Sequence, residues 1–132
     1  METTFSKQAL AYDRYALVQL FRAIEELRGV DPEIPAQGVA LFLYSAIYPG
    51  CTMADLQKNL GMTQSSCSRN VSALSDWHRL DKPGHGLLAA TADPMERRRK
   101  IVRLTEKGEQ LAIALTDAVM NPIRLSPFKD VR

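Results

Sequence analysis

The stretch from Leu56 to Leu74, LQKNLGMTQSSCSRNVSAL, constrains the fold of this chain more than any other. Its apolar side chains fall where two short helices crossing at a steep angle need contacts, namely at Leu56, Leu60, Met62, Cys67, Val71 and Leu74. Gly61 stands where the chain must turn sharply. Thr52, with Asp55 at the capping-box offset, and Thr63 can cap the two helices. The pattern predicts a helix-turn-helix.

The second of these helices, expected over residues 64–77, presents short polar side chains and one long cation on its other face. Small side chains let a helix approach the major groove of DNA closely, and glutamine and arginine can hydrogen-bond adenine and guanine edges or phosphates. We call this second helix the recognition helix. Its candidate DNA-contacting residues are Thr63, Gln64, Ser65, Ser68, Arg69 and Ser72.

A second basic element follows at residues 93–100. Two β-capable runs, LLAATA and KIVRLT, bracket a turn that Asp93 and Pro94 can initiate, which predicts a hairpin. An arginine held at a hairpin tip can enter a narrow, electronegative minor groove. We call this hairpin the wing. Its candidate DNA-contacting residues are Asp93, Arg97, Arg98, Arg99 and Lys100.

Long helices are expected on both sides of this region. Residues 3–29 have helical periodicity with an unusually wide apolar face, which favours a partner helix from a second subunit; the alternative is a central core helix. A helix that starts near Pro35 should bury Val39, Leu43 and Ile47. Thr105 can cap a last helix, expected over 105–121, before Pro122.

Length and composition indicate one soluble domain. The chain has 132 residues and a formal net charge of +2, and its positive charge is concentrated from Arg97 to Lys107. It lacks an apolar run long enough to span a membrane, and its N-terminus does not resemble a secretion signal, so we expect a cytoplasmic protein without a membrane partner.

No pattern in the sequence predicts catalysis, a metal or a cofactor. Cys51 and Cys67 have no ligand spacing; Cys67 falls on the inward stripe of its helix, and we interpret both as reduced thiols. His78 and His85 have no acidic or thiol partner at ligand spacing. We therefore expect a protein that is not an enzyme, with no catalytic residues, no metal site and no cofactor.

The order of elements, together with DPMERRRKIVRLTEKG, resembles the winged helix-turn-helix regulators of the multiple-antibiotic-resistance repressor (MarR) family. The matching wing residues are Asp93, Pro94, Glu96, Arg97, Arg98, Leu104, Thr105 and Gly108, and the resemblance covers roughly residues 34 to 115. The strand LLAATA lacks the charges often seen there, which removes phosphate contacts.

The resemblance implies one domain over residues 1–132, mainly α with a small β-hairpin wing. The winged helix-turn-helix would occupy residues 34–108, flanked by dimerisation helices at 3–29 and 105–121. Asp93 would brace a wing arginine. The implied partners are double-stranded DNA, a second copy of the chain and, as in many relatives, a small aromatic effector.

We therefore expect a homodimeric transcription regulator, more specifically a repressor, that binds a palindromic operator. Its two half-sites should lie about one helical turn apart. The alternative is a winged-helix protein-interaction module that binds a polymerase or host factor, because a fold does not fix a function.

Overall fold

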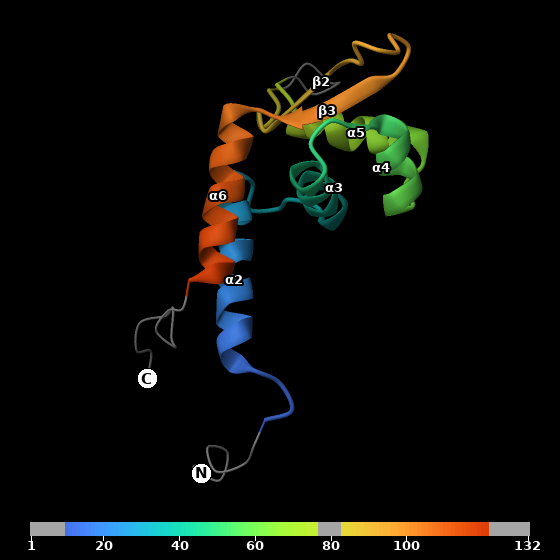
Figure 1. Cartoon of the computed structure of the whole chain (residues 1–132). Helices are drawn as coiled ribbons and strands as arrows, with labels where there is room; N and C mark the ends of the chain where they lie inside the picture. The colour runs from blue at the N-terminus through green and yellow to red at the C-terminus, as the bar shows by residue number, and fades with distance from the viewer. Residues whose placement is uncertain (1–9, 77–82, 122–132) are drawn as a thin grey trace.

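A computed structural model describes residues 10–76 and 83–121 of the chain (Figure 1). The elements run in the order α2 (Arg14–Val30), α3 (Ala36–Ile47), β1 (Cys51–Thr52), α4 (Met53–Leu60), α5 (Gln64–Leu74), β2 (Leu88–Ala92), β3 (Lys100–Leu104) and α6 (Glu106–Met120). The predicted class, mainly helical with a small β-structure, is confirmed. None of the described helices is both long and apolar enough to cross a membrane.

The first described helix starts later than the predicted residue 3. Asp13 caps α2, because its carboxylate accepts hydrogen bonds from the N–H groups of Tyr15 (2.9 Å) and Ala16 (3.3 Å). Residues 10–13 are not helical, and the earlier part of the prediction lies outside the described residues. The helix therefore begins at Arg14 and ends at Val30.

Helices α2 and α6 form a layer of their own. They lie side by side, and Figure 1 shows this pair extending away from α3, α4, α5 and the sheet. The side chain of Gln19 donates to the backbone oxygen of Val119, and Ala23 and Leu27 are buried in the hydrophobic core. The buried residues of α2 therefore all lie in its C-terminal half, and its N-terminal half contacts α6 through Gln19.

Helix α3 corrects part of one prediction, because Val39 packs partly buried against the core but the other two residues predicted to be buried do not. Its buried residues are Gly38, Leu41, Phe42 and Ser45, whereas Leu43 is 39% exposed and Ile47 is 65% exposed. Apolar residues surround most of this helix, so its periodicity allows more than one inward face. Packing against α5 and β3 selects the face with Leu41 and Phe42.

The helix-turn-helix forms as predicted from its local signals. The Thr52 and Asp55 side chains make the reciprocal bonds of a capping box, each 3.0 Å long. Gly61 ends α4 in the left-handed conformation at φ 63°, which a residue with a side chain rarely adopts. Thr63 caps α5 through its hydroxyl.

The wing belongs to a three-stranded antiparallel sheet in the order β1–β3–β2. Strands β2 and β3 form the predicted hairpin, with Leu88 opposite Leu104 and Ala92 opposite Lys100. The sequence did not predict β1, in which Cys51 pairs with Val102. This short strand ties the base of the wing to the start of α4.

The recognition helix ends earlier than predicted, at Leu74 instead of residue 77, which lies outside the described part. Residues 84–87 cross its end, and their N–H groups donate over 2.7–3.0 Å to the carbonyl oxygens of Ala73, Leu74, Ser75 and Asp76. A Cβ atom at Gly84 would lie 1.8 Å from the oxygen of Ser75. The glycine thus permits the contact that closes the helix.

The same segment also reaches α2 and α6. Thr105, which caps α6, donates its N–H to the oxygen of Leu87 (2.9 Å) and its hydroxyl to that of Gly86 (2.6 Å). His85 Nε2 lies 3.2 Å from the carboxylate of Asp31 at the end of α2. Residues 84–87, which we call the strap, therefore connect the recognition helix to both outer helices.

Candidate nucleic-acid interface

The outward face of α5 is polar because its apolar side chains are used in the core. Cys67, Val71 and Leu74 are buried, whereas Gln64, Ser65, Ser68 and Arg69 are exposed and Ser72 is half-buried. Thr63 is exposed as well, but its hydroxyl accepts the N–H of Ser66 (3.1 Å). Thr63 therefore stabilises the start of the helix whatever else it contacts.

A residue that the sequence did not predict orients α5. Gln37 at the start of α3 accepts hydrogen bonds through its side-chain oxygen from Ser66 Oγ (2.9 Å) and Asn70 Nδ2 (3.2 Å). The partners are 29 and 33 residues away along the chain, so no local pattern could have indicated the contact. Gln37 fixes one side of α5 and leaves the Gln64 and Ser68 side open.

The wing tip is held by its own backbone and by one ion pair. The N–H of Asp93 donates to the oxygen of Arg99 (2.8 Å), and the N–H of Arg99 donates to the oxygen of Glu96 (2.9 Å). The Asp93 carboxylate accepts from the N–H of Met95 (2.9 Å) and lies 3.8 Å from the guanidinium of Arg99. The cations therefore sit on an ordered turn.

Helix α5, helix α4 and the wing enclose a cleft of about 430 Å³. It brings together Gln64 and Ser68 of α5 with three consecutive wing cations, and its lining is Met53, Ala54, Gln57, Gln64, Ser68, Arg98, Arg99 and Lys100. Gln57 was not predicted. Ser65, Arg69, Ser72 and Arg97 do not line this cleft. We call it the basic cleft.

Electrostatics agree with this geometry. The backbone N–H and the side chain of Thr52 lower the pKa of Asp55 below its ordinary value, and the positive charge of Arg99 adds a smaller effect in the same direction. The positive charge of Arg99 therefore acts on the start of α4 as well as on the cleft. An anion in the basic cleft would meet three positive side chains and the amides of two glutamines.

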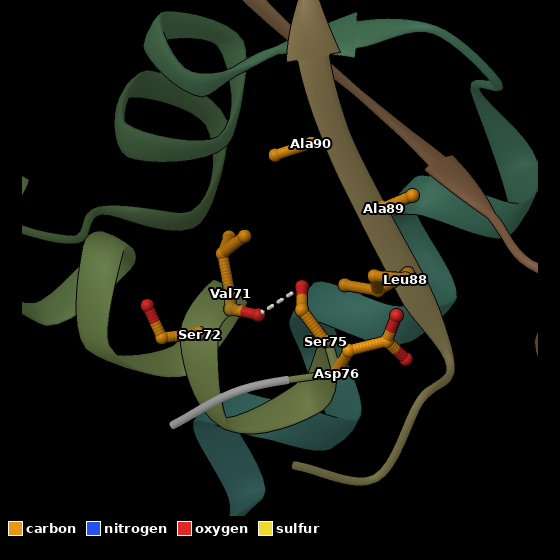
Figure 2. Close-up of a pocket in the computed structure, with 7 residues that line it drawn as sticks. All are labelled: Val71, Ser72, Ser75, Asp76, Leu88, Ala89 and Ala90. Carbon is orange, nitrogen blue, oxygen red and sulfur yellow. Dashed lines mark hydrogen bonds between the residues drawn. The ribbon is translucent and has the colours of Figure 1, made fainter. Parts of the chain in front are cut away.

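A second cavity of about 340 Å³ continues along α5 toward the base of the wing (Figure 2). Its lining is Val71, Ser72, Ser75, Asp76, Leu88, Ala89 and Ala90. The Ser75 hydroxyl donates to the oxygen of Val71 (2.6 Å), so it is already satisfied. We call this the base cavity; it contains an acid and, among the described residues, no cation.

Helices α2 and α6 expose large apolar side chains away from this site. They include Leu20, 54% exposed, and Met120, 70% exposed, together with Tyr15, Leu17, Ile24, Ile113 and Val119. A third cavity, about 450 Å³ and mostly apolar, lies between α2 and α3 with Ile24, Leu43 and Arg28 in its lining. These surfaces are available for a partner and for an apolar ligand.

Neither cysteine is available for chemistry at the surface. Cys51 and Cys67 are both buried free thiols, and burial raises the pKa of each. In residues 10–76 and 83–121, histidine, cysteine and acidic side chains do not gather in a group that could hold a metal ion.

Solved structures share this architecture. A transcriptional regulator from Thermotoga maritima is 21% identical with a TM-score of 0.62; the match covers 78% of this chain and 65% of the regulator, just under two thirds of its length. The S. aureus MepR protein, solved in a complex with DNA, is 24% identical with a TM-score of 0.61, covering 75% of this chain and 73% of MepR.

The PcaV transcriptional regulator of Streptomyces coelicolor, solved with its natural ligand, is 22% identical with a TM-score of 0.55, covering 84% of this chain and 78% of PcaV. No protein-family model and no curated protein matches the sequence. The similarity is therefore one of fold.

Proposed function

We propose that this chain, which has the winged-helix fold of MarR-family regulators, is a sequence-specific DNA-binding transcription regulator. The observation that carries the proposal is the basic cleft, where the polar side of α5 faces Arg98, Arg99 and Lys100 across a space open to an anion. The MepR protein, which shares this fold, was solved in a complex with DNA, and this supports the proposal of DNA binding.

In this proposal α5 enters the major groove. Ser65 and Ser68 are small enough for close approach, while Gln64 and Arg69 supply the hydrogen-bonding groups that distinguish bases. A phosphate of the flanking backbone occupies the basic cleft, and the wing arginines reach the adjacent minor groove or its phosphates. The regulator represses by occupying a promoter.

The regulator acts as a homodimer. Leu17, Leu20 and Ile24 on α2 and Ile113 and Met120 on α6 form an exposed apolar surface, and a second copy would cover it. A two-fold dimer places two α5 helices in successive major grooves, so the half-sites of its operator lie about 34–36 Å apart.

The regulator also responds to a small aromatic anion. The mostly apolar cavity between α2 and α3 would accommodate the ring, and Arg28 at its lining would face the negative group. PcaV, solved with its natural ligand, supports an effector on this fold. Binding there would change how α3 and α5 sit relative to α2.

Selection of bound fragments from genomic and randomised DNA tests the proposal. We expect an enriched inverted repeat whose half-sites are separated by 10–10.5 base pairs. Arg69→Ala should weaken binding to the selected site far more than binding to random DNA, whereas the control Arg14→Ala, at an exposed position at the start of α2, should change neither. The same loss on both DNAs would show that Arg69 contacts phosphate only, and recovery of no preferred site would favour a protein-interaction module instead.

A further inference from the structure

The basic cleft and the base cavity follow one another along the recognition helix. Gln64 and Ser68 face the first, and Ser72 and Ser75 face the second. Residues at this spacing lie on one side of a helix, so both cavities share the same α5 wall. On the hairpin, the base cavity lies two residues from the Ala92–Lys100 pair, at the Ala90–Val102 pair. The two cavities have no lining residue in common but follow one another along α5, and we call them together the groove.

Among the residues that the structure describes, the charge along this groove changes sign. Its outer end carries Arg98, Arg99 and Lys100, whereas its inner end carries Asp76. Ala89, Ala90, Thr91 and Ala92 of β2 are exposed but uncharged, so this strand offers no cation to the inner end. A sugar-phosphate backbone lying in the groove would be attracted at one end and repelled at the other.

Asp76 is exposed, and its place is fixed by the strap. Figure 2 shows Ser75 and Asp76 between the end of α5 and strand β2. A Cβ atom built on Gly86 would lie 3.4 Å from the Asp76 carboxylate. That carboxylate makes no hydrogen bond or ion pair within the described part of the chain. Lys107, whose stem lies near the same glycine, directs its ammonium to the oxygen of His85 (2.8 Å).

We propose that Asp76 is a specificity-determining residue that repels phosphate from the inner end of the groove. This rests on the proposed function. DNA is then held only where the wing cations bind its phosphates and Gln64 and Arg69 can contact its bases, and sliding toward the wing base is disfavoured. An acid here weakens binding to all DNA but weakens it more for sequences that lack base contacts.

The size of the effect follows from Coulomb repulsion. Two charges about 8 Å apart in water repel by an amount equivalent to roughly 1.4- to 2.4-fold in affinity, depending on screening. A dimer carries the interaction twice, which gives roughly two- to six-fold. Replacing the acid by a cation adds up to one phosphate contact per subunit, and the log-log salt slope then steepens by about 1.8 per dimer.

Asp76→Asn, Asp76→Arg and the control Glu26→Gln test the inference. Glu26→Gln removes the same charge from an exposed position on α2, a helix that lines neither cavity of the groove. Fluorescence anisotropy measures the affinity of the full chain for a random 30-base-pair duplex and for its selected site at several salt concentrations. Thermal melting shows that each variant is folded.

We expect Asp76→Asn to bind random DNA roughly two- to six-fold more tightly than the parent, with a smaller gain on the selected site, and Asp76→Arg to steepen the salt slope. Asp76→Asn matching Glu26→Gln on both DNAs, with an unchanged slope for Asp76→Arg, would overturn the inference while leaving the regulator intact. If the parent itself shows no salt-dependent DNA binding, the proposed function fails and the inference with it.

Discussion

Arg98 is the wing cation best suited to reveal where phosphate sits. It is exposed, it lines the basic cleft, and no hydrogen bond or ion pair within the described residues holds it, in contrast to Arg99, which lies beside Asp93. Arg98→Ala should therefore leave the hairpin turn unchanged and remove one positive charge from the cleft of each subunit. The predicted consequence is a weaker dependence of DNA binding on salt.

The magnitude follows from counterion release. Each phosphate contact contributes about 0.9 to the slope of log affinity against log salt, so a dimer that loses two contacts changes by about 1.8. Between 50 and 200 mM salt this change amounts to about a 12-fold factor. The affinity advantage of the parent over Arg98→Ala should thus be about 12 times larger at 50 mM than at 200 mM salt.

Anisotropy titration of one labelled duplex across this range measures both slopes. Arg14→Ala is the matched control, because it removes the same exposed side chain from the start of α2, a helix that lines neither the basic cleft nor the base cavity. It should keep the parent slope. A slope for Arg98→Ala equal to that of Arg14→Ala would refute the placement of phosphate in the basic cleft.

Three further predictions concern stability and reactivity. Gly108→Ala should lower the free energy of unfolding in urea by about 2–3 kcal/mol, because a methyl group there would lie 2.1 Å from a backbone oxygen. Gly29→Ala on α2, with open space around it, should instead raise the free energy of unfolding by roughly 0.5 kcal/mol. The parent should be more stable than Asp55→Asn at pH 7. Because the pKa of Asp55 is lowered in the folded state, its stabilisation is lost on protonation, and the difference should disappear as the pH falls below about 4. A difference in stability that persists at pH 2 would contradict this. Cys51 and Cys67 should react with a thiol reagent much more slowly in the native protein at pH 7 than in denaturant, because both are buried with raised pKa values, and equal rates would refute their burial.

Local signals allowed the helix-turn-helix to be predicted residue by residue. Thr52, Gly61 and Thr63 act on backbone groups within a few residues of themselves, so their effects can be read from the sequence. The hairpin was predicted for the same reason. In contrast, the start of α2 at Asp13 is hard to predict, because the apolar periodicity continues on its N-terminal side and indicates a longer helix.

The errors arise where long-range packing decides. Both faces of α3 are apolar, and only contacts with distant elements select Phe42 over Ile47 as a core residue. Strand β1 consists of two residues whose pairing with Val102 has no local signature. Within the site, Gln37, Gln57 and Asp76 owe their positions to neighbours far along the chain, so no pattern of spacing could identify them.

The strap also has a consequence for how this molecule opens. Its amide protons at residues 84–87 are bonded to the end of α5, while two of its carbonyl oxygens accept from Thr105 at the start of α6. Those amides can exchange with solvent deuterium only when their hydrogen bonds to α5 break, and the bonds of the strap to Thr105 oppose that separation. The end of the recognition helix, the base of the wing and the start of α6 should therefore exchange as one cooperative unit, more slowly than the wing tip. Local unfolding of the hairpin would then leave the recognition helix in place.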